Sequence, residues 1–413
     1  MANKSNTILV IGFNTRPLVY SLYKAGYIVY AVDFFGDLDL FPYVKDFISI
    51  IRELDKNYNN LNDKYSKYLA SFALNLLHKH LDTNFILIGS GIDDAYEERK
   101  LISDEIEHLD VLSLNNELEI VKKARDIEFL YDFLNSQGII TPFYCSLDQY
   151  KLKKADLKYP FILKKKRSAG GVNVFKIKEE KHLASQIKIL EKKSFIPSEW
   201  ITQEYINGIP VSCTVISDGN ECEIISINRQ IVGAEFLNSP KEFIYCGNVV
   251  PAGLPKQENI NISKISTALT LELNLKGING FDFVIKDNHP YLMECNPRIP
   301  GSISASESSL DLNLLDLHVK SFFPNEWKNV KDVISSIESR NFTTKFVFFA
   351  PKNIQKNLLI SINKLKNVYD KSEPNRELLK GEPLCTILYK AKTLSESFNG
   401  AKEIVKKIDG IIG

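Results

Sequence analysis

The sequence predicts an α/β layer for residues 1–112, followed by an α+β region that is rich in antiparallel hairpins. Residues 8–12 (ILVIG) form the continuous apolar run that is typical of a buried parallel strand. A helix predicted over 16–25 separates it from a second strand at 27–33, and this alternation is the pattern of an α/β unit. Farther along, short strands face each other across tight turns such as Asp218-Gly219-Asn220, which indicates antiparallel pairing.

The remaining elements follow from apolar runs bounded by turn residues. Residues 117–137 have a helical pattern that ends at Gly138, because glycine and the nearby Pro142 terminate helices. Residues 12–16 (GFNTR) lack the second and third glycines of GxGxxG, which argues against a nicotinamide dinucleotide site. The other predicted helices cover 262–275 and 395–408, and the other predicted strands cover 85–89, 159–163, 172–177, 201–206, 213–216, 223–227, 281–285, 291–296, 346–349 and 383–390.

Composition and charge indicate a cytoplasmic protein. Its 413 residues are enough for about two or three domains. The net charge is only +1, from 52 basic and 51 acidic residues, so no overall field favours nucleic acid or an anionic membrane. The six cysteines are scattered without CxxC spacing, which is typical of buried residues in a reducing compartment. The apolar run at 8–13 is too short for a signal peptide, and no stretch approaches the length of a bilayer span.

Between Gly280 and Gly301, an acidic residue interrupts a short apolar strand. Asp282 is unusual there, because burying an unpaired carboxylate is costly. Glu294 and Asn296 share one face of the returning strand, and carboxylate and amide oxygens are ligands that Mg²⁺ takes together with phosphates. Arg298 would then meet the phosphates. The alternative is an ordinary acid-bearing hairpin whose last residues form a strand-ending turn.

A basic loop with two glycines runs from Lys164 to Gly171 between two predicted strands. Small residues let backbone N–H groups approach phosphate oxygens, and lysine adds positive charge. The loop is not a Walker A motif, because GxxxxGK[ST] is absent and a strand follows it. The alternative is an exposed basic hairpin tip.

Together these motifs resemble the ATP-grasp superfamily along nearly the whole chain. Residues 160–164 (PFILK) with 168–171 (SAGG) are similar to its glycine-rich strand–loop–strand, and 203–208 (QEYING) to its adenine-binding hinge. The hairpin matches its Mg²⁺–triphosphate hairpin, and 138–142 (GIITP) is similar to its entry into the lid subdomain. Within the superfamily the chain most resembles the archaeal and methylotroph predicted carboligases related to biotin carboxylase, a likeness that includes 14–17, 33–37 and the tail at 381–386.

The resemblance implies an ATP-grasp fold and a set of nucleotide contacts. The Rossmann-like pre-ATP-grasp layer would cover 1–112, the ATP-grasp domain 113–320 with its lid at about 143–200, and an α+β region that completes the core 321–413. ATP with Mg²⁺, or Mn²⁺ in its place, is the implied cofactor. The implied roles are Lys164 on the α/β-phosphates, Ser168, Ala169, Gly170 and Gly171 over the phosphate chain, Gln203, Glu204, Tyr205 and Ile206 around the adenine, Asp282, Glu294 and Asn296 on the metal, and Arg298, with Lys164, as catalytic residues.

Two positions depart from the pattern of the superfamily. The place of its second ATP lysine falls near Ile127, so Lys122, Lys123 or Arg125 would substitute, or none would. The place of its ribose-binding acid holds Pro210 and Val211, which leaves the ribose contact unassigned.

The implied reaction joins a carboxylate and an amine, both small molecules, through an acylphosphate with release of ADP. A carboxylase-like enzyme that activates bicarbonate and a non-catalytic nucleotide sensor are the alternatives, and a homodimer is compatible with each. Arg16, Ser90 and Asp93 follow N-terminal strands, where open α/β sheets bind ligands, although Asp93 is expected rather to cap the next helix. The other substrate candidates are Arg229, with a surface strand arginine as the alternative, and Asn248, in a polar loop at 245–248.

Overall fold

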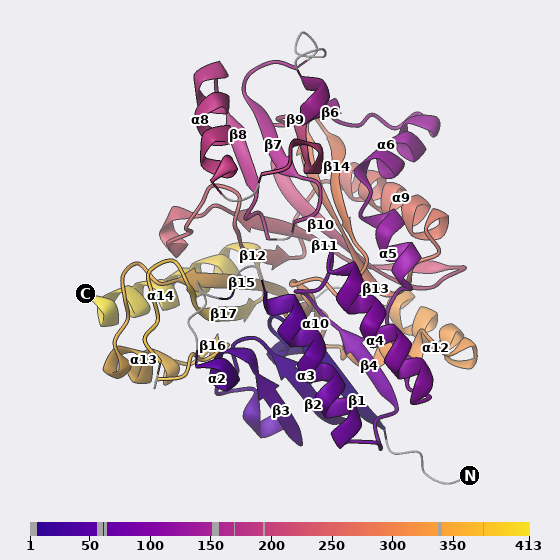
Figure 1. Ribbon diagram of the computed structural model, residues 1–413, viewed down its shortest axis with the longest axis vertical. Helices are drawn as coiled ribbons and strands as arrows, with labels where there is room; N and C mark the ends of the chain where they lie inside the picture. Colours follow the sequence, from indigo (N-terminus) through magenta and orange to yellow (C-terminus); the bar gives the residue numbers. More distant parts are fainter. Residues whose placement is uncertain are drawn as a thin grey trace.

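The computed structural model describes residues 6–55, 61, 64–150, 157–168, 170–192, 195–337, 341–374 and 376–413. The described residues form three β-sheets, one in the N-terminal layer, one in the centre and one that projects from the rest (Figure 1). The fold class predicted from the sequence, α/β followed by α+β, is confirmed. Among the described residues, no helix is long and apolar enough to cross a bilayer.

The N-terminal layer is a parallel sheet with strand order β3-β2-β1-β4-β5. Its central strand is buried on both faces, since Ile8 and Val10 belong to one apolar core while Leu9 and Ile11 belong to another. The short strand β3 escaped prediction because DFIS is brief and half polar. The elements are β1 (Thr7–Gly12), α1 (Arg16–Lys24), β2 (Ile28–Asp33), β3 (Asp46–Ser49), α2 (Ile50–Leu54), α3 (Tyr65–Lys79), β4 (Phe85–Ile88), α4 (Tyr96–His108) and β5 (Leu112–Ser113), with a 3₁₀ turn at Phe41–Tyr43.

Two short helices, α5 (Leu118–Ala124) and α6 (Ile127–Ser136), lead from this layer to the segment predicted as the lid, so the single helix predicted at 117–137 is wrong. The helical conformation is interrupted at Asp126. The backbone of this residue is extended, and its carboxylate accepts the Glu128 N–H at 3.0 Å. Aspartate is a strong helix N-cap, so this residue starts a new helix instead of continuing the old one. The break holds Arg125 at the end of α5.

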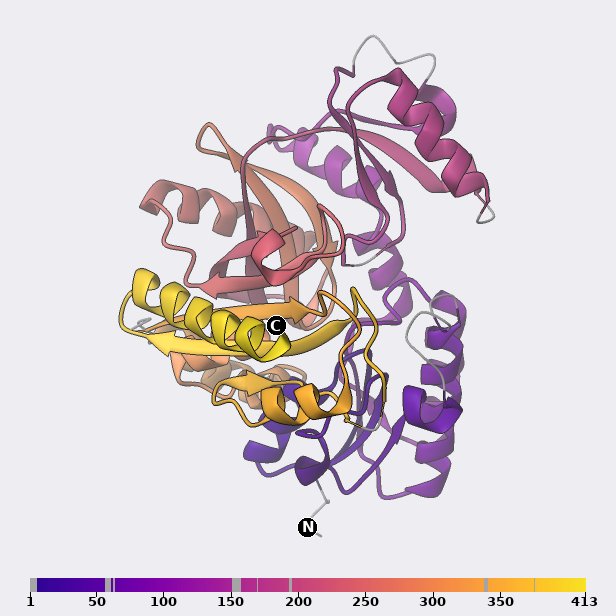
Figure 2. The same ribbon diagram turned by 90° about the vertical axis from the view of Figure 1, so that its left-hand side faces the viewer.

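The segment predicted as the lid forms a four-stranded antiparallel sheet with order β6-β9-β7-β8, and we keep the name lid for residues 144–204. Figure 2 shows this sheet and α8 projecting from the rest of the molecule. Its apolar side has a small core of its own, which includes Phe161, Leu163 and Trp200. The elements are β6 (Tyr144–Ser146), β7 (Phe161–Lys165), β8 (Val174–Ile177), α8 (Glu180–Glu191) and β9 (Trp200–Glu204), with 3₁₀ turns at Leu147–Gln149 and Pro197–Glu199.

The central sheet has eight strands in the order β14-β13-β10-β11-β12-β15-β17-β16. Strand β15 pairs with β12, so residues beyond 320 complete the same sheet, while the domain division itself stays a prediction. The segment 245–248, predicted as a loop, is strand, because it pairs with both neighbours. The strands are β10 (Ile209–Asp218), β11 (Cys222–Val232), β12 (Tyr245–Val250), β13 (Lys276–Lys286), β14 (His289–Asn296), β15 (Phe342–Phe349), β16 (Val368–Tyr369) and β17 (Pro383–Ala391).

The two faces of the central sheet differ in polarity, and this difference places the site. Val211, Phe281 and Phe283 pack with α9 in one apolar core. Their neighbours along the strands, such as Asp282, point to the opposite face, because side chains alternate. The helices around the sheet are α9 (Lys256–Glu272), α10 (Ile303–Leu310), α11 (Leu314–Lys320), α12 (Pro324–Ser335), α13 (Lys356–Asn363) and α14 (Leu394–Ile412), with a 3₁₀ turn at Glu235–Leu237.

Gly247 provides a test of the packing at the centre of this sheet. Its φ is +128°, and an added Cβ would lie 2.0 Å from the Lys345 carbonyl oxygen. We expect Gly247→Ala to lower the free energy of unfolding by about 3 kcal/mol or more, since the backbone of β15 must move. Chemical denaturation measures the change. Gly410→Ala is the matched control, because nothing lies within 4 Å of its added Cβ in α14 and alanine favours a helix. Equal effects of the two substitutions would contradict this account.

Candidate active site

The hairpin of β13 and β14 brings the predicted metal ligands together. Asp282 and Glu294 are cross-strand partners, and Met293 is the extra residue of a bulge beside them. The turn residues Asp287 and Asn288 both have positive φ, as two-residue hairpins require. The Asn296 Nδ2 group donates to Asp282 Oδ2 at 2.9 Å and to Glu294 Oε1 at 3.1 Å. The predicted convergence of two carboxylates and one amide is therefore present.

The electrostatics of the pair suit a cation. Burial and the neighbouring Glu294 raise the pKa of Asp282 well above its usual value. Burial also opposes the ionised form of Glu294, but Arg125 and hydrogen bonds outweigh it and hold its pKa below the usual value. In the described part of the chain, no group of three or more His, Cys, Asp or Glu could hold a metal. These hard oxygen donors fit Mg²⁺ only if a ligand such as a phosphate supplies further oxygens.

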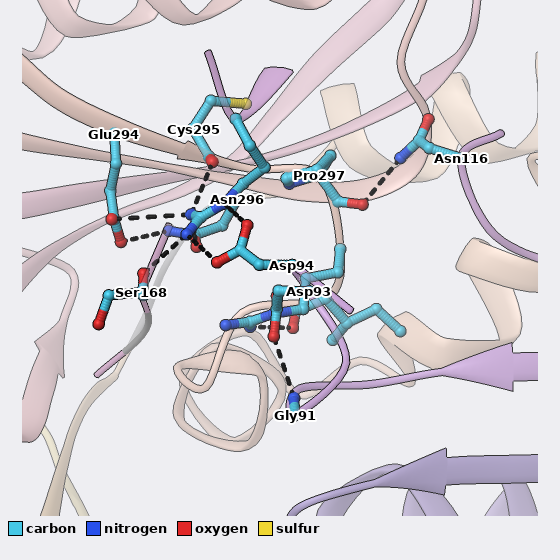
Figure 3. A network of polar contacts seen from close by, with 12 residues as sticks. Gly91, Asp93, Asp94, Asn116, Ser168, Glu294, Cys295, Asn296 and Pro297 are labelled. Atoms are coloured by element: carbon cyan, nitrogen blue, oxygen red, sulfur yellow. Dashed lines mark hydrogen bonds and ion pairs between the residues drawn. The ribbon is translucent and has the colours of Figure 1, made fainter. Parts of the chain in front are cut away.

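Arg125 reaches the hairpin from the end of α5. Its guanidinium binds Asp94 through two contacts of 3.0 Å, donates to the Ser168 carbonyl oxygen at 2.7 Å, and donates to Asn296 Oδ1 at 3.3 Å. Glu294 Oε2 lies 3.7 Å away. Figure 3 shows Asp94, Ser168, Glu294 and Asn296 gathered around this contact. The side chain is only 3% exposed, so its charge depends on these partners.

Of the three basic candidates for the missing lysine, only Arg125 contacts the hairpin in the hydrogen bonds and ion pairs of the described residues. Lys122 pairs with Glu119, and Lys123 pairs with Glu272, both on exposed surface. The sequence alone could not show which of the three contacts the hairpin, because this depends on the residue at which α5 ends.

Lys164 comes to the hairpin from the lid. It lies near the end of β7, and its ammonium donates to the Met293 carbonyl oxygen at 3.3 Å. Burial lowers its pKa to about 8, although Glu294 acts in the opposite direction. No carboxylate of the described residues forms an ion pair with this half-buried lysine, so an anionic ligand would be favoured beside it.

The glycine-rich loop continues from this strand. Ser168 accepts a hydrogen bond from Asn173 at its Oγ, and both Gly170 and Gly171 have positive φ. A Cβ at Gly171 would lie 1.8 Å from the Phe243 carbonyl oxygen, so only glycine allows the loop to approach the segment before β12 so closely. Ala169, also predicted to bind nucleotide, lies outside the described residues.

Arg298 faces the N-terminal layer. Its Nε donates to Asp93 through a very short contact, and its Nη1 donates to the Ile299 carbonyl oxygen at 3.1 Å. Asp93 also accepts the Gly91 N–H at 3.0 Å. The expectation that Asp93 caps the next helix is wrong, because Ala95 is the N-cap of α4. Burial opposes the ionised form of Asp93, but Arg298 and Arg125 outweigh it and lower the pKa of that carboxyl.

The predicted hinge residues have different surroundings. Gln203 is buried and donates to the Tyr131 hydroxyl at 2.5 Å, which directs its side chain into the core. Glu204 is exposed, and its backbone N–H is bonded to the Phe143 carbonyl oxygen at 2.8 Å. The Tyr205 ring lies 3.9 Å from the Lys176 ammonium, and Ile206 is buried. Of these four side chains, those of Glu204 and Tyr205 are the two that are not buried.

Asn248 belongs to a polar row that crosses the central sheet. Its backbone neighbours are Gln230 on β11 and Lys345 on β15. Gln230 donates to Asp282 at 2.7 Å, which links the row to the hairpin. Lys345 donates to the Gly301 carbonyl oxygen at 2.8 Å, and burial lowers its pKa to about 8. Asn248 is fully buried and accepts the Tyr245 hydroxyl at 2.8 Å, but its Nδ2 has no partner among the described residues.

The other substrate candidates lie apart from this row. Arg229 precedes Gln230 on β11, so alternation directs its side chain to the opposite face of the sheet. Arg16 is buried at the start of α1, where it binds Asp370 at 2.7 Å and lies 3.7 Å from Asp39. The Ser90 carbonyl oxygen accepts the Phe13 N–H at 2.7 Å. Gln230 and Lys345, which the sequence analysis did not select, face the site. Each is a polar residue within a strand, the same signal that identified Asp282.

Comparison with known proteins gives one matching domain family and several relatives. Residues 124–302 match the family model described as an ATP-grasp domain. An uncharacterized protein of Methanocaldococcus jannaschii is 29% identical over 389 residues, which cover 92% of this chain and 88% of that protein. The D-alanine–D-alanine ligase of Leptospira interrogans is 27% identical over 188 residues, which cover 42% of this chain and 52% of the ligase. This chain therefore matches about half the length of that ligase.

Solved structures share the fold across nearly the whole chain. The L-amino acid ligase of Bacillus licheniformis superposes with a TM-score of 0.68 at 16% identity and covers 97% of both chains. The biotin carboxylase domain of Hydrogenobacter thermophilus 2-oxoglutarate carboxylase, solved with MgADP, ADP and bicarbonate, has a TM-score of 0.70 at 11% identity. That match covers 97% of this chain and 89% of the other. At these identities the likeness establishes the fold alone.

The carboxylate pair is expected to lower the stability of the fold and to favour metal binding. Because the pKa of Asp282 is raised, the folded protein loses stability as the pH rises through that pKa. We expect Asp282→Asn to raise the free energy of unfolding at neutral pH by about 1 kcal/mol and to weaken metal binding. Urea denaturation without metal measures the first effect. Asp287→Asn, in the exposed turn of the same hairpin, should change stability by less than about 0.5 kcal/mol. A destabilised Asp282→Asn variant would contradict this interpretation.

Proposed function

We propose that this chain is an ATP-grasp ligase that joins a carboxylate to an amine through an acylphosphate, with release of ADP and phosphate. The observation that carries the proposal is the meeting of three cationic side chains with a pair of carboxylates. Lys164 and Arg125 reach the hairpin from two other parts of the fold. Arg298 lies just after β14, and its charge acts on Asp282.

The residues at the hairpin suit a triphosphate. Lys164 would neutralise phosphate charge, and the backbone of the loop at 168–171 would cover the phosphate chain. Asp282, Glu294 and Asn296 would hold Mg²⁺, which when bound neutralises charge on the phosphates. The MgADP bound to the biotin carboxylase domain supports this assignment. Glu204 and Tyr205 would contact the adenine at the hinge, with the backbone at Ile206.

Arg298 is the residue best placed to act on the transferred phosphoryl group. Asp93 fixes its Nε, and Ile299 accepts from its Nη1, so the direction of the guanidinium is set before substrate binds. Preorganised charge of this kind supplies most of what phosphoryl transfer requires from a protein. A substrate carboxylate would attack the γ-phosphorus, and ADP would leave. The lid would exclude water from the acylphosphate until the amine attacks its carbonyl carbon and phosphate departs.

The polar row next to the hairpin offers a place for the substrates. Asn248 Nδ2 and Ser302 Oγ are buried hydrogen-bonding groups without a partner among the described residues. Lys345 lies between them, since it is the neighbour of Asn248 on β15 and bonds to Gly301. Because unpaired buried donors favour an acceptor-rich ligand, we assign these groups to the binding of a carboxylate-bearing small molecule.

The remaining properties are also proposals. We infer a protein that works in the cytoplasm on small molecules, as a homodimer, without nucleic acid or membrane partners. Mn²⁺ would replace Mg²⁺ at the same oxygen ligands. The proposed division of the chain is 1–112, 113–320 and 321–413.

Release of ADP tests the proposed reaction. The purified protein is supplied with Mg²⁺, ATP and pairs drawn from amino acids, other small carboxylic acids and amines. We expect ADP release only with a matching pair, and a loss of about a thousandfold or more in Glu294→Gln, because the variant keeps the shape of the site but loses a metal-binding charge. Bicarbonate, with and without biotin, forms a separate arm. ADP release with bicarbonate alone would favour a carboxylase. If no substrate gives more ADP than the Glu294→Gln variant does, the result would count against an enzyme of this class.

The pH dependence of nucleotide binding tests the role of Lys164. Its ammonium form attracts phosphate, and burial lowers its pKa to about 8. We therefore expect the affinity for ATP to fall as the pH rises above 8, by up to about tenfold per pH unit until the pKa of the bound form is reached. Calorimetry between about pH 7 and pH 9 measures this affinity.

Lys164→Met should bind ATP weakly at every pH and should lose the pH dependence. Lys165→Met is the matched control, because Lys165 is the next residue and pairs with Glu199 on the lid surface at 3.2 Å. A Lys164→Met variant with the pH profile of the unmodified protein would place the titrating group elsewhere.

A further inference from the structure

The carboxamide of Asn296 is turned so that its oxygen faces away from the two carboxylates. Nδ2 donates to Asp282 and Glu294, while Oδ1 accepts from Arg125 at 3.3 Å. The opposite orientation would set the oxygen against two carboxylates and the amide N–H groups against a guanidinium, which are both repulsive arrangements. The hydrogen-bond network therefore fixes which end of the amide faces the acids.

This orientation is incompatible with metal binding by Asn296. Mg²⁺ and Mn²⁺ accept oxygen ligands, so the carboxamide must turn over for Oδ1 to face a cation between the carboxylates. The χ2 torsion angle of asparagine has a broad distribution, so rotation of the carboxamide itself costs little free energy. However, it would bring Nδ2 against Arg125 Nη1, where two donors meet. The Arg125 contact and the metal contact of Asn296 thus exclude each other.

Several hydrogen bonds hold Arg125 in the position from which it donates to Asn296. Asp94 binds two of its nitrogens at 3.0 Å each, and Ser168 accepts from Nη2 at 2.7 Å. With 3% of the side chain exposed, water does little to replace these partners. Its charge also lies 3.7 Å from Glu294 Oε2 and so competes with a cation for that carboxylate. A phosphate group beside Ser168 would offer the guanidinium an alternative anion.

We propose that Arg125 is a positioning residue that keeps the metal site closed to a free cation and opens it only when the nucleotide arrives. Through its hydrogen bond, Arg125 holds Asn296 in the orientation that excludes metal. Phosphate beside Ser168 draws the guanidinium away from Asn296, and the freed carboxamide then turns its oxygen toward the cation. The proposal rests on the proposed use of a metal–nucleotide complex, but it concerns binding and does not require turnover.

Binding of Mn²⁺ alone, followed by electron paramagnetic resonance, tests the proposal in the full-length protein without nucleotide. We expect Arg125→Met and Arg125→Lys both to bind Mn²⁺ about tenfold more tightly than the unmodified protein, because neither keeps the fork that bonds Asp94 and Asn296 together. Lys122→Met removes one charge from the same helix and should leave the affinity unchanged. With a non-hydrolysable ATP analogue present, the unmodified protein should gain Mn²⁺ affinity more than either Arg125 variant.

Arg125→Lys keeps the positive charge and therefore distinguishes the proposed role of the hydrogen bond from simple charge repulsion. If only Arg125→Met binds Mn²⁺ more tightly, the charge alone governs the site, and the proposal is wrong. It is equally wrong if neither variant differs from Lys122→Met. Because these measurements use no carboxylate or amine substrate, a failed ADP-release screen would leave their outcome intact, and the converse also holds.

A measurement on the unmodified protein covers the case in which the Arg125 variants do not fold. The side-chain amide of Asn296 is observed by nuclear magnetic resonance after labelling with ¹⁵N-asparagine, and its signal is identified by its absence in Asn296→Asp. Mg²⁺ alone at a concentration that saturates the site in the presence of the analogue should leave the signal in place, whereas Mg²⁺ with the ATP analogue should shift it. A shift with Mg²⁺ alone would overturn the proposal.

Discussion

The guanidinium of Arg125 connects the three parts of the fold that must meet at the site. It binds Asp94 in the N-terminal layer, the Ser168 carbonyl oxygen in the lid, and Asn296 at the end of the central hairpin. Because the side chain is buried, its charge is stable only while these partners surround it. This one side chain therefore couples the positions of the layer, the lid and the hairpin, in addition to the apolar core that the layer shares with the central sheet.

The central sheet supplies the second constraint, since its two faces have different roles. Phe281 and Phe283 pack with α9 on one face, and Asp282 between them faces Gln230 and Asn296 on the other. A shift of one residue in register would exchange these faces and bury the carboxylate among apolar side chains. The same apolar packing that stabilises the fold therefore fixes the direction of the metal-binding groups.

Several charges at the site are held in surroundings that oppose their usual ionisation. Burial raises the pKa of Asp282 and lowers the pKa values of Lys164 and Lys345 to about 8. Each of these groups would gain from a charge of opposite sign, which a cation, a phosphate or a carboxylate would bring. Sites that bind such ligands are commonly less favourable in isolation than the rest of the fold, because the ligand completes them.

The sequence by itself determined the features that depend on neighbours along the chain. Alternation placed Glu294 and Asn296 on one face, turn residues set the hairpin, and the motifs as a set indicated the ATP-grasp fold. The tertiary structure decided the contacts between distant residues. It selected Arg125 over Lys122 and Lys123, paired Asp93 with Arg298 across 205 positions, and turned Gln230 rather than Arg229 toward the acids. Local patterns report which face a side chain shares with its neighbours, but only packing and register determine which elements that face meets.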